Sequence, residues 1–207
     1  MAHVFNRYSH DSQAVGGGAP VWVRIPEKRV GGWLLENKLR DFEVLASGSP
    51  VEYDYKTHKA KILKCFEVVS SSDGNIVLKK TARTPMLYAG MNVMVAPSAI
   101  TGTGTAVTLT SAMISETEDS YILASSGLTA SAGAFIVEAA DAGSSKKMYA
   151  IPTDLTIDDT VGGDQNSGGV ASGIKVLYEN MIPAMPDIVK KNIPFVQFEW
   201  FPEEITE

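Results

Sequence analysis

The sequence predicts a mainly β protein, either an antiparallel β-barrel or a sandwich-like domain, with one short helix between its last strands. Three observations support this fold class. Short segments of alternating apolar and polar residues recur along the chain, and turn-forming residues separate them at roughly 8–12-residue spacing. No long apolar stripe with a 3.6-residue period occurs. The 18 Gly and 10 Pro gather in the connections between the segments, as many short strands require.

The composition divides the chain into three parts. Residues 1–19 are polar and end in three consecutive glycines, which predicts a flexible N-terminal arm. Residues 20–151 carry most of the alternating segments and predict a β-rich domain. Residues 152–207 begin with an acidic, glycine-rich loop and end in a strand, a helical turn and a strand that we expect to pack on the β domain.

The first half of the chain contains the clearest strand signals. Residues 21–25 alternate and stop at Pro26, which cannot donate a backbone hydrogen bond to a sheet. Residues 46–63 predict a hairpin that turns at Lys56, Thr57 and His58. Asp73-Gly74 then connects this hairpin to "NIVLKK" at 75–80, and an Asp-Gly pair is a strong hairpin signal.

Further strands are predicted between residues 86 and 151. Gly90 marks a bend or a strand pair in residues 86–98. Residues 105–124 predict a hairpin in which Val107 and Leu109 lie on one strand, an acidic turn follows, and Tyr121 begins the return strand. Two more strands are expected around the Gly-Ser loop near residue 143.

The C-terminal part alternates, breaks at prolines and alternates again. Ile174, Val176 and Tyr178 would face one side of a strand. Pro183 and Pro186 isolate residues 187–192, where Asp187 is expected to cap one or two helical turns. Pro194 ends this helix, and residues 195–201 predict the last strand.

The charge distribution argues against a nucleic-acid partner. Residues 1–90 carry 13 Lys and Arg against 9 Asp and Glu, whereas residues 91–207 carry 5 against 15. Nucleic-acid binding requires clustered positive charge, which the acidic second half lacks. The sequence also has no secretory signal and no apolar run of about 18 residues, so we expect no membrane span and synthesis in a cytoplasm.

Candidates for chemistry are few. The three histidines, at positions 3, 10 and 58, have no nucleophile or metal-ligand partner at a meaningful spacing, and solvated surface histidines are expected. Cys65 cannot form an internal disulfide and is expected to be a small core residue. Asp158, Asp159 and Asp164 offer hard oxygen atoms suited to Ca²⁺, but their spacing lacks the EF-hand pattern, and a solvated turn is the simpler interpretation. We predict no cofactor.

The tryptophans are candidates for either core or interface. Trp22 alternates out of phase with Val21 and Val23, so it faces away from the core if the valines face inward. Trp22 and Trp33 are therefore candidates for a subunit interface, and a core position is equally open for Trp22. Trp200 is expected in the core.

Several motifs together resemble the head fibre and head decoration proteins of tailed bacteriophages. These motifs are "ASGSPVEYDYKTHKAKIL" at 46–63, "YAIPTDLTIDDTV" at 149–161, and a C-terminal series of Met181-Ile182-Pro183, the helical turn 187–192 and "IPFVQF" at 193–198. They cover about half of the chain and are structural rather than catalytic. Residues 85–145 match no motif of these proteins.

The resemblance implies a trimer that sits on the outer surface of an icosahedral head, with the major capsid protein as partner and the virion as location. Repeated copies on a lattice would gain avidity from a modest single contact. Phe5, Arg7 and Tyr8 in the arm are candidates for contacting the capsid, and a solvated tail is the alternative for this segment. The protein is not expected to be an enzyme.

Two other classes of function stay open from the residues. A carbohydrate-binding or adhesin module would need exposed aromatic side chains in a groove, for which Trp33 and Tyr55 are candidates. A hydrolase would need a pair of carboxylates, such as Asp158 and Glu138.

Overall fold

The computed structural model describes residues 21–24, 27–28, 32–36, 39–162 and 167–200. Within these ranges the protein is mainly β, with several antiparallel sheets and one short α-helix near the C-terminus. The predicted class is therefore confirmed at this level. The sheets stay open, and no closed barrel is found in the described residues.

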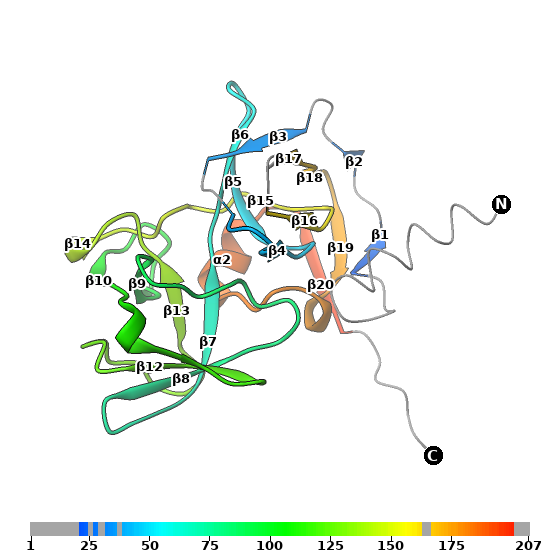
Figure 1. The fold of residues 1–207 in the computed structure, drawn as a ribbon. Coiled ribbons are helices and arrows are strands. Elements are labelled where there is room, and N and C mark those ends of the chain that lie inside the picture. Colours follow the sequence, from blue (N-terminus) through cyan, green and yellow to red (C-terminus); the bar gives the residue numbers. More distant parts are fainter. Residues whose placement is uncertain (1–20, 25–26, 29–31, 37–38, 163–166, 201–207) are drawn as a thin grey trace, which may run out of the picture.

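The largest sheet has eight strands and occupies one side of the molecule (Figure 1). All its neighbouring strands pair antiparallel. In spatial order its strands are β11 (Ile114–Glu116), β12 (Ser120–Ala124), β8 (Asn75–Lys79), β7 (Cys65–Ser72), β13 (Phe135–Glu138), β9 (Asn92–Val95), β10 (Gly104–Thr108) and β14 (Gly143–Lys146).

A five-stranded sheet lies next to it and is continued by two small ribbons. Its order is β15 (Asp154–Leu155), β5 (Pro50–Asp54), β6 (Lys59–Ile62), β3 (Trp33–Leu35) and β17 (Ser167–Gly168). The ribbons are β4 (Val44–Leu45) with β16 (Thr160–Val161), and β2 (Glu27–Lys28) with β18 (Ala171–Ser172).

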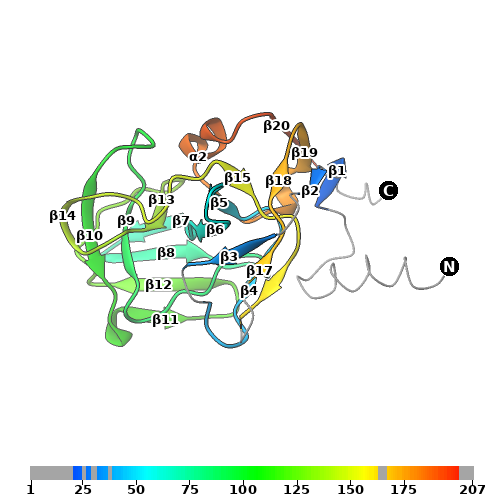
Figure 2. The ribbon, with the colours of Figure 1, turned by 90° about the horizontal axis from the view of Figure 1, so that it is seen from above.

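The third sheet joins the two ends of the described chain. Its order is β1 (Trp22–Arg24), β19 (Lys175–Tyr178) and β20 (Val196–Glu199), so β20 is an edge strand within the described residues. Strands β19 and β20 run parallel, because the 3-10 turn η2 (Glu179–Met181) and the helix α2 (Asp187–Asn192) carry the chain back between them. In Figures 1 and 2 this sheet lies on the side away from β10 and β14.

The predicted local turns form as the residues dictate. The β5–β6 hairpin closes where the Asp54 carboxylate accepts hydrogen bonds from the Lys56 backbone N–H (2.9 Å) and the Thr57 hydroxyl (2.6 Å). Between β7 and β8, Asp73 and Gly74 both adopt positive φ angles, of 51° and 76°. A two-residue turn of this type matches the twist of antiparallel strands, so the Asp-Gly prediction is confirmed.

Two predictions of local structure are wrong. Residues 105–109 do not pair with the strand of Tyr121: β10 pairs with β9 and β14, and β12 pairs with β11 and β8. The 3-10 turn η1 (Ser111–Met113) separates the two units. Asp187 is also not the cap of α2, because Pro186 occupies the N-cap and Asp187 is the first helical residue. A carboxylate in the first turn still complements the helix dipole.

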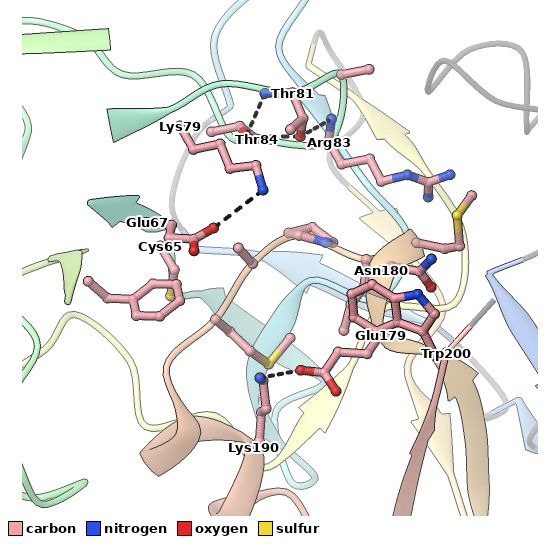
Figure 3. A pocket seen from close by; sticks show the side chains of 17 residues that line it. Cys65, Glu67, Lys79, Thr81, Arg83, Thr84, Glu179, Asn180, Lys190 and Trp200 are labelled. Atoms are coloured by element: carbon pink, nitrogen blue, oxygen red, sulfur yellow. Dashed lines mark hydrogen bonds and ion pairs between the residues drawn. The ribbon is translucent and has the colours of Figure 1, made fainter. Parts of the chain in front are cut away.

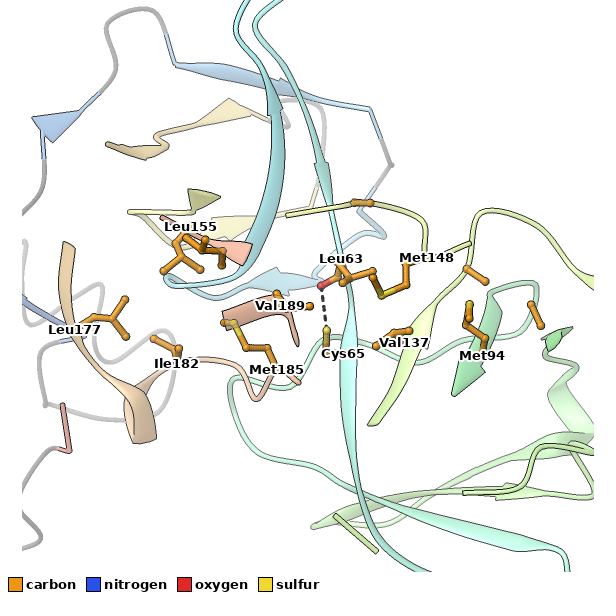
Figure 4. Packing of buried hydrophobic residues seen from close by; sticks show 14 residues of the cluster. Leu63, Cys65, Met94, Val137, Met148, Leu155, Leu177, Ile182, Met185 and Val189 are labelled. Carbon is orange, nitrogen blue, oxygen red and sulfur yellow. Dashed lines mark hydrogen bonds between the residues drawn. The ribbon is translucent and has the colours of Figure 1, made fainter. Parts of the chain in front are cut away.

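The core consists of three clusters of buried side chains. One belongs to the five-stranded sheet and its flanks and includes Trp33, Val51 and Ile62. A second lies within the eight-stranded sheet and its loops, around Phe66 and Leu123. The third ties the C-terminal segment to the rest of the molecule, and Figure 4 shows its members.

In this third cluster, Leu177 of β19 and Val189 of α2 pack in one group with Leu63, Cys65 and Val137 from the β domain. Strand β19 and helix α2 thus share one apolar cluster with strands of the large sheet. Cys65 is 3% exposed and packs as a small apolar residue, as expected. Its burial strongly raises the pKa of the thiol, which disfavours the nucleophilic thiolate.

Candidate functional site

A cleft lies between the end of β8 and the segment that leads from η2 through α2 to β20 (Figure 3). Its volume is about 660 Å³. One wall comes from β7, β8 and the loop that follows, Thr81–Thr84. The opposite wall comes from residues 179–185, Lys190 and Trp200. Segments that are distant in the sequence thus form one concave surface, which is called the C-terminal cleft below.

Charged side chains line the C-terminal cleft on both walls. Lys79 Nζ lies 3.7 Å from Glu67 Oε2, and Lys190 Nζ lies 2.5 Å from Glu179 Oε1 (Figure 3). Arg83 differs from these two lysines, because its guanidinium has neither a hydrogen bond nor an ion-pair partner in the residues that the structure describes. Its half-buried position lowers its pKa, against a weaker opposite effect of the Asp159 charge.

The rest of the cleft is largely apolar. Met181, Pro183 and Met185 line it from the segment before α2, and Phe135 lines it from β13. Trp200 closes one side, and 64% of its surface is exposed. The prediction of a core position for Trp200 is therefore wrong: its neighbour Phe198 faces the core cluster, and Trp200 follows β20 at the rim of the cleft.

A second surface lies along α2 and β20. It is a shallow apolar groove of about 480 Å³, lined by Ile174, Lys190, Lys191, Ile193, Phe195, Val196, Gln197 and Phe198. Ile174 and Phe195 are 62% and 74% exposed, although both are large apolar residues. This surface, called the β20 edge surface, follows the edge strand of the three-stranded sheet.

The backbone holds Phe195 outward. Its φ angle is 56°, in the left-handed region that non-glycine residues enter at a cost of about 1–2 kcal/mol. Its carbonyl accepts a hydrogen bond from the Lys175 backbone N–H at 2.8 Å, and the Lys175 ammonium lies 3.3 Å from the Pro194 carbonyl oxygen. These contacts fix the turn from α2 into β20 and leave the ring of Phe195 in solvent.

The structure separates the two tryptophans that were predicted at a subunit interface. Trp33 is only 2% exposed and belongs to the core around the five-stranded sheet, so it has no free surface for a second subunit. Trp22 is half-buried, and its indole N–H donates to Ser47 Oγ (2.9 Å) and to the Ile157 carbonyl (3.2 Å). Val23, expected inward, is 44% exposed.

The other predicted site residues are dispersed. Phe5, Arg7, Tyr8 and Asp164 lie outside the described residues. Asp159 accepts a hydrogen bond from the Ser47 backbone N–H at 2.6 Å, which gives it a structural partner. No group of three or more His, Cys, Asp or Glu side chains that could hold a metal ion occurs in the described ranges.

The residues predicted for glycan binding and for hydrolysis do not come together as expected. Tyr55 is 49% exposed and its hydroxyl donates to Asp154 at 2.5 Å, whereas Trp33 is buried, so these two do not form an exposed aromatic groove. Asp158 is exposed and is not among the charges that act on Glu138: burial raises the pKa of Glu138 to about 7, Lys64 opposes this effect, and Glu43 adds to it.

Glu138 lies in a group of buried charges. Lys64 and Glu43 form an ion pair with side chains that are each 1% exposed, and Glu138 is 8% exposed. The Lys64 ammonium also lies 4.9 Å from the centre of the Tyr88 ring. None of these groups is among the residues that line the C-terminal cleft. A ligand in the cleft would therefore not contact Glu43 or Glu138.

Sequence reasoning missed Arg83 and placed Trp200 wrongly. Arg83 lies in "KKTARTPM", and nothing in the spacing of this segment indicates that it forms a cleft with residues about 100 positions later in the chain. Trp200 carried a usable signal, because Glu203 and Glu204 follow it closely and glutamates are more typical of surface than of core.

Comparisons with protein-family models, with curated proteins and with solved structures found no match to this chain. Among the described helices, none has the length and apolar character needed to cross a lipid bilayer. The functional argument therefore rests on the residues and on the geometry above.

Proposed function

We propose that this protein is a non-catalytic structural protein of a virus particle, which attaches as a trimer to the outer surface of a tailed-bacteriophage head. The sequence motifs at 46–63, 149–161 and 181–198 support this proposal by their resemblance to head fibre and decoration proteins. The proposed partners are the major capsid protein and further copies of the same chain.

The observation that carries the proposal is the β20 edge surface. Its edge strand has a neighbour on one side only within the described residues, and large apolar side chains beside it are exposed. Open strand edges and exposed apolar groups favour association, and proteins cover them or use them as interfaces. Burial of Ile174 and Phe195 against another subunit would remove this apolar surface from water.

Two measurements test the proposal. Purified protein should co-sediment with heads that lack it and appear as external density by electron microscopy. In solution, mass photometry should give three times the chain mass of 22.2 kDa. A monomer that does not bind heads would contradict both parts of the proposal.

A matched pair of variants locates the subunit contact. Phe195→Asp should weaken the trimer, because a carboxylate would replace an apolar ring in the contact. Phe42→Asp is the control: Phe42 is 86% exposed and also has a positive φ, of 66°, but it lies in the loop before β4. Equal effects of the two substitutions would exclude the β20 edge surface as the interface.

Carbohydrate binding is a second candidate, favoured by one observation. Trp200 offers an exposed indole next to Asn180 and Glu179 in the C-terminal cleft (Figure 3). Aromatic faces bordered by polar groups are suited to sugar rings. Binding on a glycan array that is lost in Trp200→Ala would support this function, and an array without signal would remove it.

A further inference from the structure

We propose that the C-terminal cleft is a binding site for segment 201–207 of the same chain, with Glu203 paired to Arg83. The segment reads Phe-Pro-Glu-Glu-Ile-Thr-Glu and lies outside the described residues. The assignment goes beyond attachment to a head, because it concerns a contact that the chain makes with itself.

Chain connectivity places this segment at the cleft. Trp200 is part of the cleft wall, so the next residue starts at the rim. Seven extended residues span up to about 25 Å, which is sufficient to cross a cleft of about 660 Å³. A tethered segment also has an effective concentration in the millimolar range, which favours it over free ligands.

The charges that line the C-terminal cleft favour a negatively charged ligand. The side chains that line the cleft include three cations and two carboxylates, and the two carboxylates are already paired with Lys79 and Lys190. The Arg83 guanidinium is the cleft cation that has no hydrogen bond or close ion pair in the described part of the chain, and the Asp159 charge acts on it only weakly. A guanidinium removed from water favours a carboxylate, which it can bind through two parallel hydrogen bonds. Segment 201–207 has three glutamates and no lysine or arginine.

The apolar pattern of the segment matches the cleft as well. In an extended chain, side chains alternate between two faces, so Phe201, Glu203 and Ile205 share one face. Met181 and Met185 provide an apolar floor against which Phe201 and Ile205 could pack. Glu203 then points into the cleft between them, and for this reason it is assigned to Arg83. A neutral glycan would leave the guanidinium without a hydrogen-bonded counter-charge.

Zero-length cross-linking of the full-length protein tests the contact. A carbodiimide activates a glutamate and a touching lysine amine displaces it, so that an amide forms and the reagent takes up the water. Lys79 and Lys190 line the same cleft as Arg83, so a segment bound there brings its glutamates within their reach. We expect amides between these lysines and segment 201–207, beside those with Glu67 and Glu179. Lys80 and Glu116, 2.7 Å apart and outside the cleft, provide the internal reference. Absence of the expected amides while the reference amide forms would overturn the proposal.

Isotope mixing decides which chain supplies the segment. Protein labelled with ¹⁵N is mixed with unlabelled protein in urea and the two are refolded together before cross-linking, so that each oligomer can contain both labels. Contacts within one chain then give no mixed products. Mixed products would overturn the assignment to the same chain and would indicate exchange between subunits. Absence of the amides together with glycan binding that Trp200→Ala abolishes would assign the cleft to a sugar.

A second measurement reads Arg83 directly. Phenylglyoxal modifies exposed arginines, and mass spectrometry gives the rate at Arg83. In Glu203→Gln this rate should rise by about tenfold, the change expected for the loss of one charge-assisted pair. Glu118→Gln, in the exposed turn between β11 and β12, is the matched control and should leave the rate unchanged. An unchanged rate in Glu203→Gln would overturn the pairing.

Discussion

Replacement of Glu138 by Gln should stabilise the protein at alkaline pH and remove part of its pH dependence. Glu138 ends β13 and is held in place by its backbone, whose N–H donates to the Lys64 carbonyl at 3.0 Å. Its side chain is 8% exposed, and Oε2 has no hydrogen-bond partner. The nearby ammonium of Lys64 is already paired with Glu43. Two carboxylates therefore share one buried cation.

The sign of the effect follows from the direction of the pKa shift. Burial, opposed by Lys64 and reinforced by Glu43, raises the pKa of Glu138 from 4.5 to about 7. Below about pH 4.5 the carboxyl is protonated in the folded and unfolded states, and its contribution to stability is fully present. As the pH rises through 7, the folded protein must bury a charge, and this contribution is lost.

The magnitude is set by the size of the shift. Each pKa unit corresponds to about 1.4 kcal/mol, so the free energy of unfolding should fall by up to about 3 kcal/mol between pH 4.5 and 8 from this residue. Glutamine keeps the shape and carries no charge. The variant should therefore be close to wild type at pH 5 and more stable by up to about 3 kcal/mol at pH 8.

Urea unfolding followed by circular dichroism at pH 5, 6.5 and 8 measures this difference. Asp141→Asn is a control of opposite sign: the hydrogen bond from Lys146 lowers the pKa of that exposed carboxyl, so its removal costs stability at neutral pH. If Glu138→Gln changed stability equally at all three pH values, the burial of a titrating carboxyl would be refuted.

Three further substitutions test other parts of the fold. Lys175→Ala should cost about 3–5 kcal/mol, because it leaves the Asp154 carboxylate buried without its ammonium at 3.4 Å, whereas replacing both residues by apolar ones should cost much less. Gly48→Ala should destabilise far more than Gly74→Ala in thermal unfolding: both have positive φ, but only at Gly48 would the new methyl overlap a neighbouring side chain, and similar losses would contradict the packing there. Trp22→Phe should cost about 1–3 kcal/mol in urea unfolding through the loss of its indole hydrogen bonds, and a neutral substitution would place the indole in solvent.

Local features of this fold could be predicted from the sequence because adjacent residues determine them. The Asp73-Gly74 turn requires only two residues that accept positive φ. The turn between β5 and β6 requires only the carboxylate of Asp54 and the polar residues after it. Alternating residues likewise indicated strands before their partners were known.

Strand partners and inward faces could not be predicted in the same way, because distant residues decide them. In residues 174–178 the more apolar face carries Ile174 and Val176, yet the structure buries Lys175 and Leu177 of β19 instead. A buried lysine is tolerable here because Asp154, on a strand of another sheet, lies 3.4 Å away. No local sequence pattern predicts such a partner. The position of Arg83 in the cleft likewise depends on residues that are distant in the sequence.

The burial of Lys175 in place of the more apolar face has a consequence for assembly. Because Lys175 faces inward, Ile174 and the neighbouring Phe195 remain on the surface and form the β20 edge surface. Lys190 of α2 lines this surface and the C-terminal cleft as well. A subunit docked on the edge surface and a segment bound in the cleft would therefore act on the same side chain. Since Lys190 pairs with Glu179 on the cleft side, a contact that drew it toward β20 would weaken that pair and change the charge of the cleft. Cross-linking yields at Lys190 should then differ between the trimer and a Phe195→Asp monomer.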